Sequence, residues 1–165
     1  MCRTMVELAM NTKQRNPPRL EELNVLVVGN NPTDLGRVFD SLKGIPGKRI
    51  LTEIAFDLET IVDRLTRFTP NFIVIDDNIG KDELKNSVQA LLHYRKTKRI
   101  PITVLKNSNY QEAISSGVLN YILKEHLTGE SLYKALKNSM KSRRTERYLY
   151  VAYKKRKGQL KRLLS

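Results

Sequence analysis

The sequence predicts an α/β fold in which five parallel strands form one doubly wound sheet, followed by a basic, helical C-terminal extension. The sheet is predicted because short apolar, β-branched runs recur between residues 21 and 136, separated by segments with helical spacing of apolar residues. Apolar strands that alternate with amphipathic helices are typical of a parallel sheet covered on both faces. The extension is predicted because residues 137–165 carry eleven basic residues and one acidic residue.

Each predicted strand is a short apolar run bounded by residues that interrupt regular structure. Gly29 and Asn30 follow the first run, Asp76, Asp77 and Asn78 follow the third, and all are poor strand formers. The second strand is the one that is predicted from alternation of apolar and polar residues. The predicted strands cover residues 25–28, 50–56, 72–75, 102–105 and 119–123.

The predicted helices begin at residues that cap or start helices. Asn31 is suited to cap the first helix and Pro32 to begin it, and Thr128 is suited to cap the last. Apolar residues three and four apart then mark one face of each helix. The faces cover residues 35–42, 58–65, 84–92, 110–114 (closed by Gly117) and 132–136.

The charge of the chain is concentrated at its ends. The 165 residues have 30 Lys and Arg and 17 Asp and Glu, a net charge of +13, yet residues 21–136 contain equal numbers of acidic and basic residues. The expected organisation is a mildly basic leader or linker over 1–20, a neutral domain over 21–136 and a basic, helical extension over 137–165. Hydrophobic residues form 40% of the chain, which is sufficient for a buried core.

Composition also excludes several functional classes. No apolar run approaches the roughly 18 residues that span a bilayer, so no transmembrane segment is expected. The single cysteine, Cys2, leaves no internal disulfide and fits a reducing compartment, so we expect a cytoplasmic location. The sequence has no phosphate-binding glycine loop and no Ser/His/Asp arrangement, so a binding module is expected rather than an enzyme.

Polar and charged residues follow the predicted strands at the end where parallel sheets bind ligands. Right-handed crossovers place the carboxyl ends of all strands at one edge of the sheet. The sequence therefore predicts a crevice at that edge, in which two carboxylates face two lysines. Its expected residues are Gly29, Asn30, Asp76, Asp77, Asn78, Lys106 and Lys124.

These features resemble the receiver domain of two-component response regulators, which has a flavodoxin-like (βα)5 fold. The resemblance covers about residues 23–137 and rests on segments 24–32, 70–76, 100–105 and 117–124 in that order. It implies that Asp76 stands at the phosphoacceptor position, that Lys124 contacts it and that Tyr121 stands at the aromatic switch position. It also implies Mg²⁺ as a cofactor in the alternative that phosphorylation is retained, held weakly at Asp76 and Asn78.

The sequence departs from that family at three crevice positions. The acidic pair that holds magnesium is replaced by Gly29 and Asn30, the hydroxyl residue after the fourth strand by Lys106, and the proline after the lysine by Glu125. Magnesium is held through carboxylates, and a unit charge pair about 4 Å apart is worth about 4 kcal/mol at an effective dielectric of about 20. We therefore expect no cofactor, and a salt-bridge cluster in which Lys106 and Lys124 neutralise Asp76 and Asp77.

The favoured function is an atypical receiver, or pseudo-receiver, that signals through a protein partner without magnesium-dependent phosphorylation. The expected contact face carries the fourth helix, fifth strand and fifth helix, and a homodimer through this face or the extension is a further option. The alternative is a single-domain response regulator that acts in a phosphorelay by accepting a phosphoryl group on Asp76.

A third function uses the extension as a basic interaction arm. Its cations stand beside three tyrosines, a combination that suits nucleic acid, and it equally suits an anionic membrane surface or an acidic protein. The last helix can continue through the arm, although the apolar run 148–153 is also compatible with a strand. The arm comprises Arg143, Arg144, Arg147, Lys154, Lys155, Arg156 and Lys157.

Overall fold

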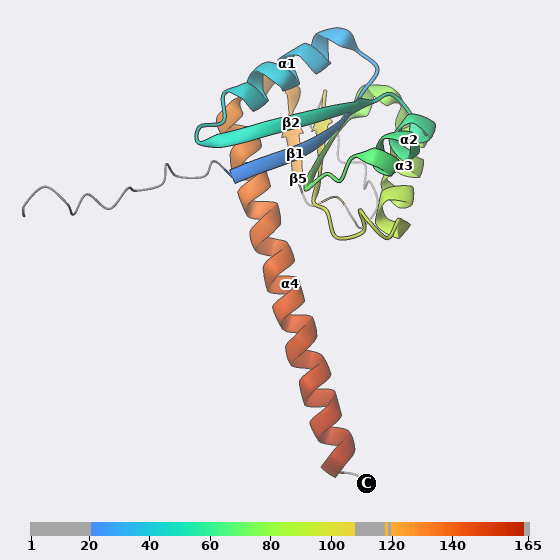
Figure 1. Cartoon of the computed structure of the whole chain (residues 1–165), viewed down its shortest axis with the longest axis vertical. Helices are drawn as coiled ribbons and strands as arrows, with labels where there is room; N and C mark the ends of the chain where they lie inside the picture. The colour runs from blue at the N-terminus through green and yellow to red at the C-terminus, as the bar shows by residue number, and fades with distance from the viewer. Residues whose placement is uncertain (1–20, 108–117, 119, 164–165) are drawn as a thin grey trace, which may run out of the picture.

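The centre of the molecule is a parallel sheet of five strands (Figure 1). The computed structural model describes residues 21–107, 118 and 120–163. The strands are β1 (Glu21–Val28), β2 (Lys48–Ala55), β3 (Phe72–Asp76), β4 (Ile102–Lys106) and β5 (Asn120–Leu123). Their order is β2-β1-β3-β4-β5 and every neighbouring pair is parallel, which confirms the predicted sheet.

Helices cover both faces of the sheet. The α-helices are α1 (Pro32–Lys43), α2 (Leu58–Arg67), α3 (Lys81–His93) and α4 (Gly129–Leu163), and two short 3₁₀ helices are η1 (Asp77–Ile79) and η2 (Lys124–His126). Val25 and Val27 of β1 join the core cluster of α1 and α4, whereas Leu26 and Val28 join that of α2 and α3. Because alternate side chains enter different cores, the central strands are apolar throughout rather than alternating.

The start of α1 follows the predicted capping pattern. Oδ1 of Asn31 accepts a hydrogen bond from the Thr33 N–H at 3.0 Å, and Pro32 is the first helical residue. This cap fixes the direction in which α1 leaves the carboxyl edge of the sheet. The helix predicted at 110–114 and the leader over 1–20 lie outside the described residues.

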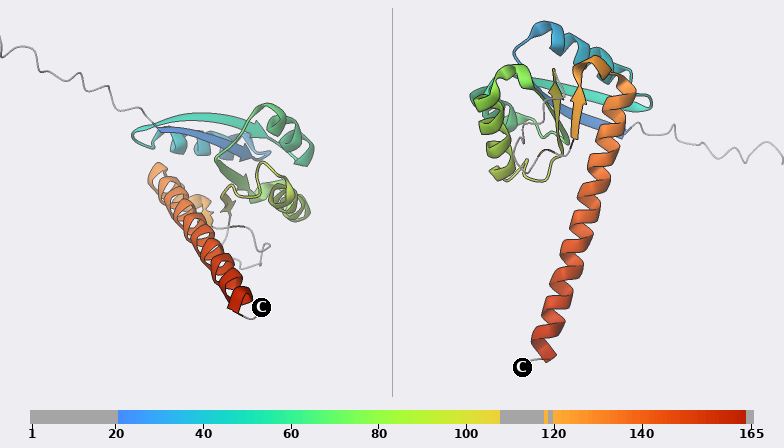
Figure 2. Two further views of the ribbon diagram at one scale, coloured as in Figure 1. Left: turned by 60° about the horizontal axis from the view of Figure 1, so that its bottom comes forward. Right: turned by 180° about the vertical axis from the view of Figure 1, so that it is seen from behind.

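The last helix continues far beyond the sheet. α4 has 35 residues, which corresponds to about 50 Å at 1.5 Å per residue, and it runs through Gly158 without a break. The run 148–153 is therefore helical and not a strand. Figure 2 shows that the C-terminal part of α4 projects away from the sheet. Leu132 and Ser139 in the first part of α4 are buried, whereas Leu149 and Tyr153 further along it are exposed. Among the described helices, none has an apolar stretch long enough to cross a bilayer.

Candidate functional site

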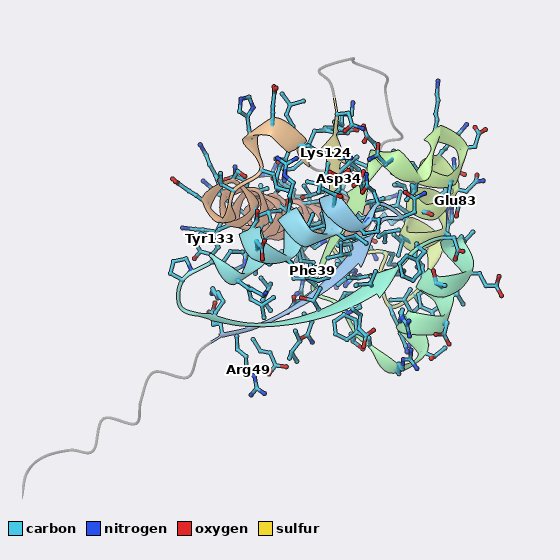
Figure 3. All side chains as sticks on the ribbon, turned by 90° about the horizontal axis from the view of Figure 1, so that it is seen from above. Asp34, Phe39, Arg49, Glu83, Lys124 and Tyr133 are labelled. Carbon is cyan, nitrogen blue, oxygen red and sulfur yellow. The ribbon has the colours of Figure 1, made fainter. Side chains whose placement is uncertain are left out.

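The crevice at the carboxyl ends of the strands is organised around the amine of Lys124. Lys124 follows β5, and only 5% of its surface is exposed. Its Nζ lies 2.5 Å from Oδ1 of Asp76, 2.9 Å from Oδ2 of Asp34 and 3.5 Å from Oδ1 of Asp77. One ammonium therefore faces carboxylates from α1, β3 and η1, and Figure 3 shows Lys124 beside Asp34 at this edge.

The sheet register explains why Lys124 meets Asp76. Asp76 is paired with Leu105, and Leu105 is paired with Ile122. Paired residues in a sheet point to the same face, and successive residues point to opposite faces. Since Lys124 comes two residues after Ile122, it lies on the same side as Asp76.

Lys106 lies on the other side, which corrects one expectation. Lys106 is paired with Leu123, so it shares a face with Tyr121 on the neighbouring strand. Its Nζ lies 4.4 Å from the centroid of the Tyr121 ring, a cation–π contact. The expected cluster of two lysines and two aspartates is thus replaced by Lys124 with three carboxylates, and Lys106 instead contacts Tyr121.

Asp34 is a crevice residue that the sequence analysis missed. It lies in the first turn of α1, where a carboxylate also interacts favourably with the helix dipole. Besides accepting from Lys124, its Oδ2 accepts a hydrogen bond from Nδ2 of Asn78 at 2.7 Å. The available signal was its position: the Asn31 cap starts α1 at the crevice edge, so an acid three residues later remains within reach of that edge.

Gly29 and Asn30, the residues that directly follow β1, contribute no carboxylate to the crevice. A Cβ at Gly29 would lie 3.2 Å from Cδ2 of Leu35 and 3.3 Å from Cβ of Asp76, closer than most van der Waals contacts. Asn30 is exposed. The carboxylate of Asp34, supplied from the first turn of α1, is therefore the acid that follows β1 in this crevice.

Asparagines form a second layer of hydrogen bonds around the carboxylates. The Asn107 N–H donates to Oδ2 of Asp77 and its Nδ2 donates to Oδ1, both at 3.0 Å. The same Nδ2 donates to Oδ1 of Asn78 at 2.6 Å, and the Asn78 N–H donates to Oδ1 of Asp76 at 2.8 Å. These bonds connect the end of β4 to η1. Asn107 was not predicted, since a lone asparagine after a strand has many structural uses.

Lys124 is fixed in place through its backbone carbonyl group as well as through the ion pairs of its amine. Nη2 of Arg37 on α1 donates to the Lys124 carbonyl oxygen at 2.5 Å. Burial by itself lowers the pKa of Lys124, but hydrogen bonds and charge interactions with Asp76 and Asp34 outweigh burial and raise this pKa above its usual 10.5. Asp76 is 2% exposed, and its second oxygen, Oδ2, has no hydrogen-bond donor among the described residues.

The predicted basic arm lies on the projecting part of α4. Its residues fall on one continuous helix, and three tyrosines lie among them. Nζ of Lys154 lies 4.9 Å from the centroid of the Tyr150 ring, and Nζ of Lys157 lies 6.0 Å from that of Tyr153. The arm therefore presents cations and aromatic rings together.

Comparison with known proteins identifies the fold. No protein-family model and no curated protein sequence matches the chain. Among solved structures, the chain is similar to the response regulator CheY4 of Vibrio cholerae, with 21% identity over 72% of this chain and 98% of that chain and a TM-score of 0.57. It is also similar to the receiver domain of the sensor histidine kinase PA1611 of Pseudomonas aeruginosa, determined with magnesium in its active-site cleft, with 17% identity over 70% and 95% and a TM-score of 0.60.

A third similar structure is longer than the matched region. The chain is 20% identical to the RcsB response regulator of Salmonella typhimurium, covering 74% of this chain and 61% of that chain, with a TM-score of 0.58. At these identities the comparisons establish the fold, which is that of receiver domains.

Proposed function

We propose that this chain is an atypical receiver module that signals through protein contact, with a crevice closed by internal ion pairs instead of being switched by magnesium-dependent phosphorylation. The observation that carries the proposal is the ammonium of Lys124, which lies 2.5–3.5 Å from the carboxylates of Asp34, Asp76 and Asp77. A fixed ammonium neutralises carboxylates without a metal ion, and the low exposure of Lys124 and Asp76 limits screening by water.

The crevice carboxylates do not suit magnesium in this arrangement. Magnesium requires nearly octahedral oxygen ligands, whereas here the amine of Lys124 lies among the carboxylates and Gly29 offers no ligand. Within residues 21–107, 118 and 120–163, no three or more acidic, histidine or cysteine side chains are grouped to hold a metal ion. The PA1611 receiver domain, with magnesium in its cleft, is the contrasting case.

One observation favours the second candidate, a phosphorylatable regulator. Oδ2 of Asp76 is buried without a hydrogen-bond donor among the residues that the structure describes. A carboxylate oxygen in that state is available to attack a phosphoryl donor, provided that the donor reaches it past Lys124. The two candidates therefore differ in whether Asp76 reacts.

The test of the proposal is phosphorylation by a small phosphodonor. The full chain is incubated with acetyl phosphate and Mg²⁺, and its intact mass is measured beside the Asp76→Asn variant. A receiver domain known to react serves as the control for the reagent. We expect identical masses with and without the reagent for both chains. A stoichiometric phosphoryl adduct on the wild type that is missing from Asp76→Asn would instead establish the second candidate.

The surface that we propose for partner contact is the β5 edge of the sheet. β5 is the last strand in the sheet order, and Tyr121 on this strand is 44% exposed. The Lys106 amine over its ring adds a positive charge to an exposed aromatic surface. Such a combination favours a partner with an acidic or aromatic contact residue.

A further inference from the structure

A basic groove separates the projecting helix α4 from the segment that connects α3 to β4. It encloses about 600 Å³ and is lined by Leu92, Lys98, Arg99, Arg143, Arg144, Glu146, Arg147 and Tyr150. We infer that this groove binds the phosphodiester backbone of single-stranded nucleic acid, and that the exposed part of α4 continues the binding surface. The inference does not depend on whether Asp76 is phosphorylated.

Cations enter the groove from two separate elements. Five of its lining residues are basic and one is acidic. Lys98 and Arg99 come from the α3–β4 connection, whereas the three arginines come from α4. Because these residues are far apart in the sequence, they form one positive site only in the folded chain. The positive site is therefore more than a run of solvated charges along a single helix. Clustered Lys and Arg are the electrostatic requirement for binding phosphates.

Hydrogen bonds around Thr97 hold the α3–β4 connection in one conformation, which fixes where its two cations lie. Thr97 is fully buried, and its Oγ1 donates a hydrogen bond to the Leu91 carbonyl oxygen at 2.7 Å. The Thr97 N–H donates to the Tyr94 carbonyl oxygen at 3.0 Å, and the Ile100 N–H donates to the Thr97 carbonyl oxygen at 2.7 Å. Lys98 and Arg99 lie within this turn, so their backbone positions relative to α4 are fixed.

Arg143 lines the groove, and one of its side-chain donors has no acceptor among the described residues. Its side chain is 23% exposed, and Nη1 lies 3.2 Å from Oε2 of Glu146. Its Nε is buried and has no acceptor in the described part of the chain. A guanidinium group matches the oxygens of phosphate in both charge and geometry. A phosphate in the groove would therefore meet the exposed part of a guanidinium whose ion-pair partner among the described residues is Glu146.

Tyrosines accompany the cations and favour nucleic acid over other anions. Tyr150 lines the groove and is 57% exposed. A hydrogen bond with Lys154, then the charges of Lys154 and Arg99, lower the pKa of Tyr150, because these cations stabilise the ionised hydroxyl. Tyr148 and Tyr153 continue as exposed rings along α4. Aromatic rings beside a basic groove allow bases to stack while the cations contact the backbone.

The shape of the site argues against a membrane surface. A groove between a helix and a loop is concave, so a flat bilayer cannot contact the cations on both walls. The consecutive cations at 154–157 also point in different directions around α4, because successive helical residues are about 100° apart. A helix that lies on a membrane instead separates its charged and apolar faces. A flexible strand of phosphates can both enter the groove and follow the helix.

The experiment measures binding of fluorescein-labelled, mixed-sequence DNA and RNA strands about 12 nucleotides long, by fluorescence anisotropy with the full chain. The groove variant is Arg99→Glu with Arg147→Glu. The matched control is Arg49→Glu with Lys85→Glu, which makes the same change of charge at exposed positions on β2 and α3. Figure 3 shows Arg49 on the β2 side of the sheet. Circular dichroism and urea unfolding verify that both variants are folded.

We expect the groove variant to lose at least about tenfold in affinity, and the control no more than about threefold. Raising the salt from about 50 to 200 mM should weaken wild-type binding roughly a hundredfold if four or five phosphates are contacted. Tyr150→Ala should weaken it by about fivefold or more through lost stacking. The DNA and RNA strands show which sugar is preferred, and binding of either supports the inference.

Three results would overturn the inference. The first is no binding of either strand at low salt, and the second is an equal loss in the groove variant and the control, which would indicate a general charge effect. The third is binding that occurs only to phosphatidylserine vesicles or to polyglutamate. That result would assign α4 to a membrane or to an acidic protein.

Discussion

Replacing Lys124 by methionine is the perturbation that bears most directly on the crevice. Methionine retains most of the length of the side chain but removes its charge and its three hydrogen-bond donors. The carboxylates of Asp76, Asp34 and Asp77 would then face one another without a cation. Asp76 would be affected most, because it is 2% exposed and cannot easily gain water.

The magnitude follows from the burial and distances of the ion pairs. The side chains of Lys124, Asp76 and Asp34 are 6%, 2% and 15% exposed, so water screens their attraction weakly. A unit pair about 4 Å apart is worth about 4 kcal/mol at an effective dielectric of about 20, and desolvation offsets part of this attraction. Removal of one partner from a buried pair costs about 3–5 kcal/mol. With an m-value of about 2 kcal/mol per molar urea, the unfolding midpoint should fall by roughly 2 M.

The assay is urea unfolding of the wild type, Lys124→Met, and Lys124→Met combined with Asp76→Asn. The double variant removes the buried carboxylate that has lost its partner, so we expect it to regain at least about half of the lost stability. If Lys124→Met does not fold while the double variant does, the same conclusion holds. A loss below about 1 kcal/mol for Lys124→Met would refute the reasoning, since that is the value of an ordinary exposed ion pair.

Further predictions concern pH, packing at two glycines and the hydrogen bonds of Asn107. The pKa of Lys124 is raised in the folded state, so its contribution is complete below pH 10.5 and is lost as the pH rises through the folded pKa. The difference in urea stability between wild type and Lys124→Met should therefore shrink above pH 10.5, and a constant difference would contradict the ion-pair account. Gly129→Ala should lower the free energy of unfolding by about 2 kcal/mol, because its Cβ would lie 2.7 Å from the Ser41 carbonyl oxygen. Gly36→Ala is the contrasting variant: its Cβ would have no atom within 4 Å, so the higher helix propensity of alanine should stabilise α1 and raise the melting temperature. Asn107→Ala should lower the melting temperature by breaking the bonds from the end of β4 to η1, and an unchanged value would show that these bonds are not formed in solution.

Much of the fold could be predicted because its determinants are local in the sequence. The apolar runs mark strands whose two faces are both buried, and Asn31 with Pro32 marks the start of α1. Asp76 and Lys124 could be placed in one crevice because each directly follows the apolar part of a strand, and parallel strands end at the same edge. The continuous α4 was one of two options, since no strong breaker precedes Gly158.

The parts that could not be predicted depend on side-chain direction and on tertiary contact. Lys106 is the last residue of β4, whereas Lys124 directly follows β5, so the register sends the two side chains to opposite faces of the sheet. A sequence does not fix strand ends to within one residue, and a difference of one residue reverses the face. Asp34 lies on a helix, so its contact with Lys124 depends on the angle at which α1 crosses the sheet edge. The groove joins Arg99 to Arg147 across the fold, and no sequence pattern connects these two positions.

The most direct test of the closed crevice is a titration of the ¹⁵N-labelled chain with Mg²⁺ and beryllofluoride, followed by NMR. The amide signals of Asp76, Asn78 and Asn107 report on the crevice because these residues lie in its hydrogen-bond network. If Lys124 occupies the crevice as proposed, these signals stay in place up to millimolar ligand. Saturable shifts of all three signals that require Mg²⁺ and beryllofluoride together would show that the crevice opens and binds both.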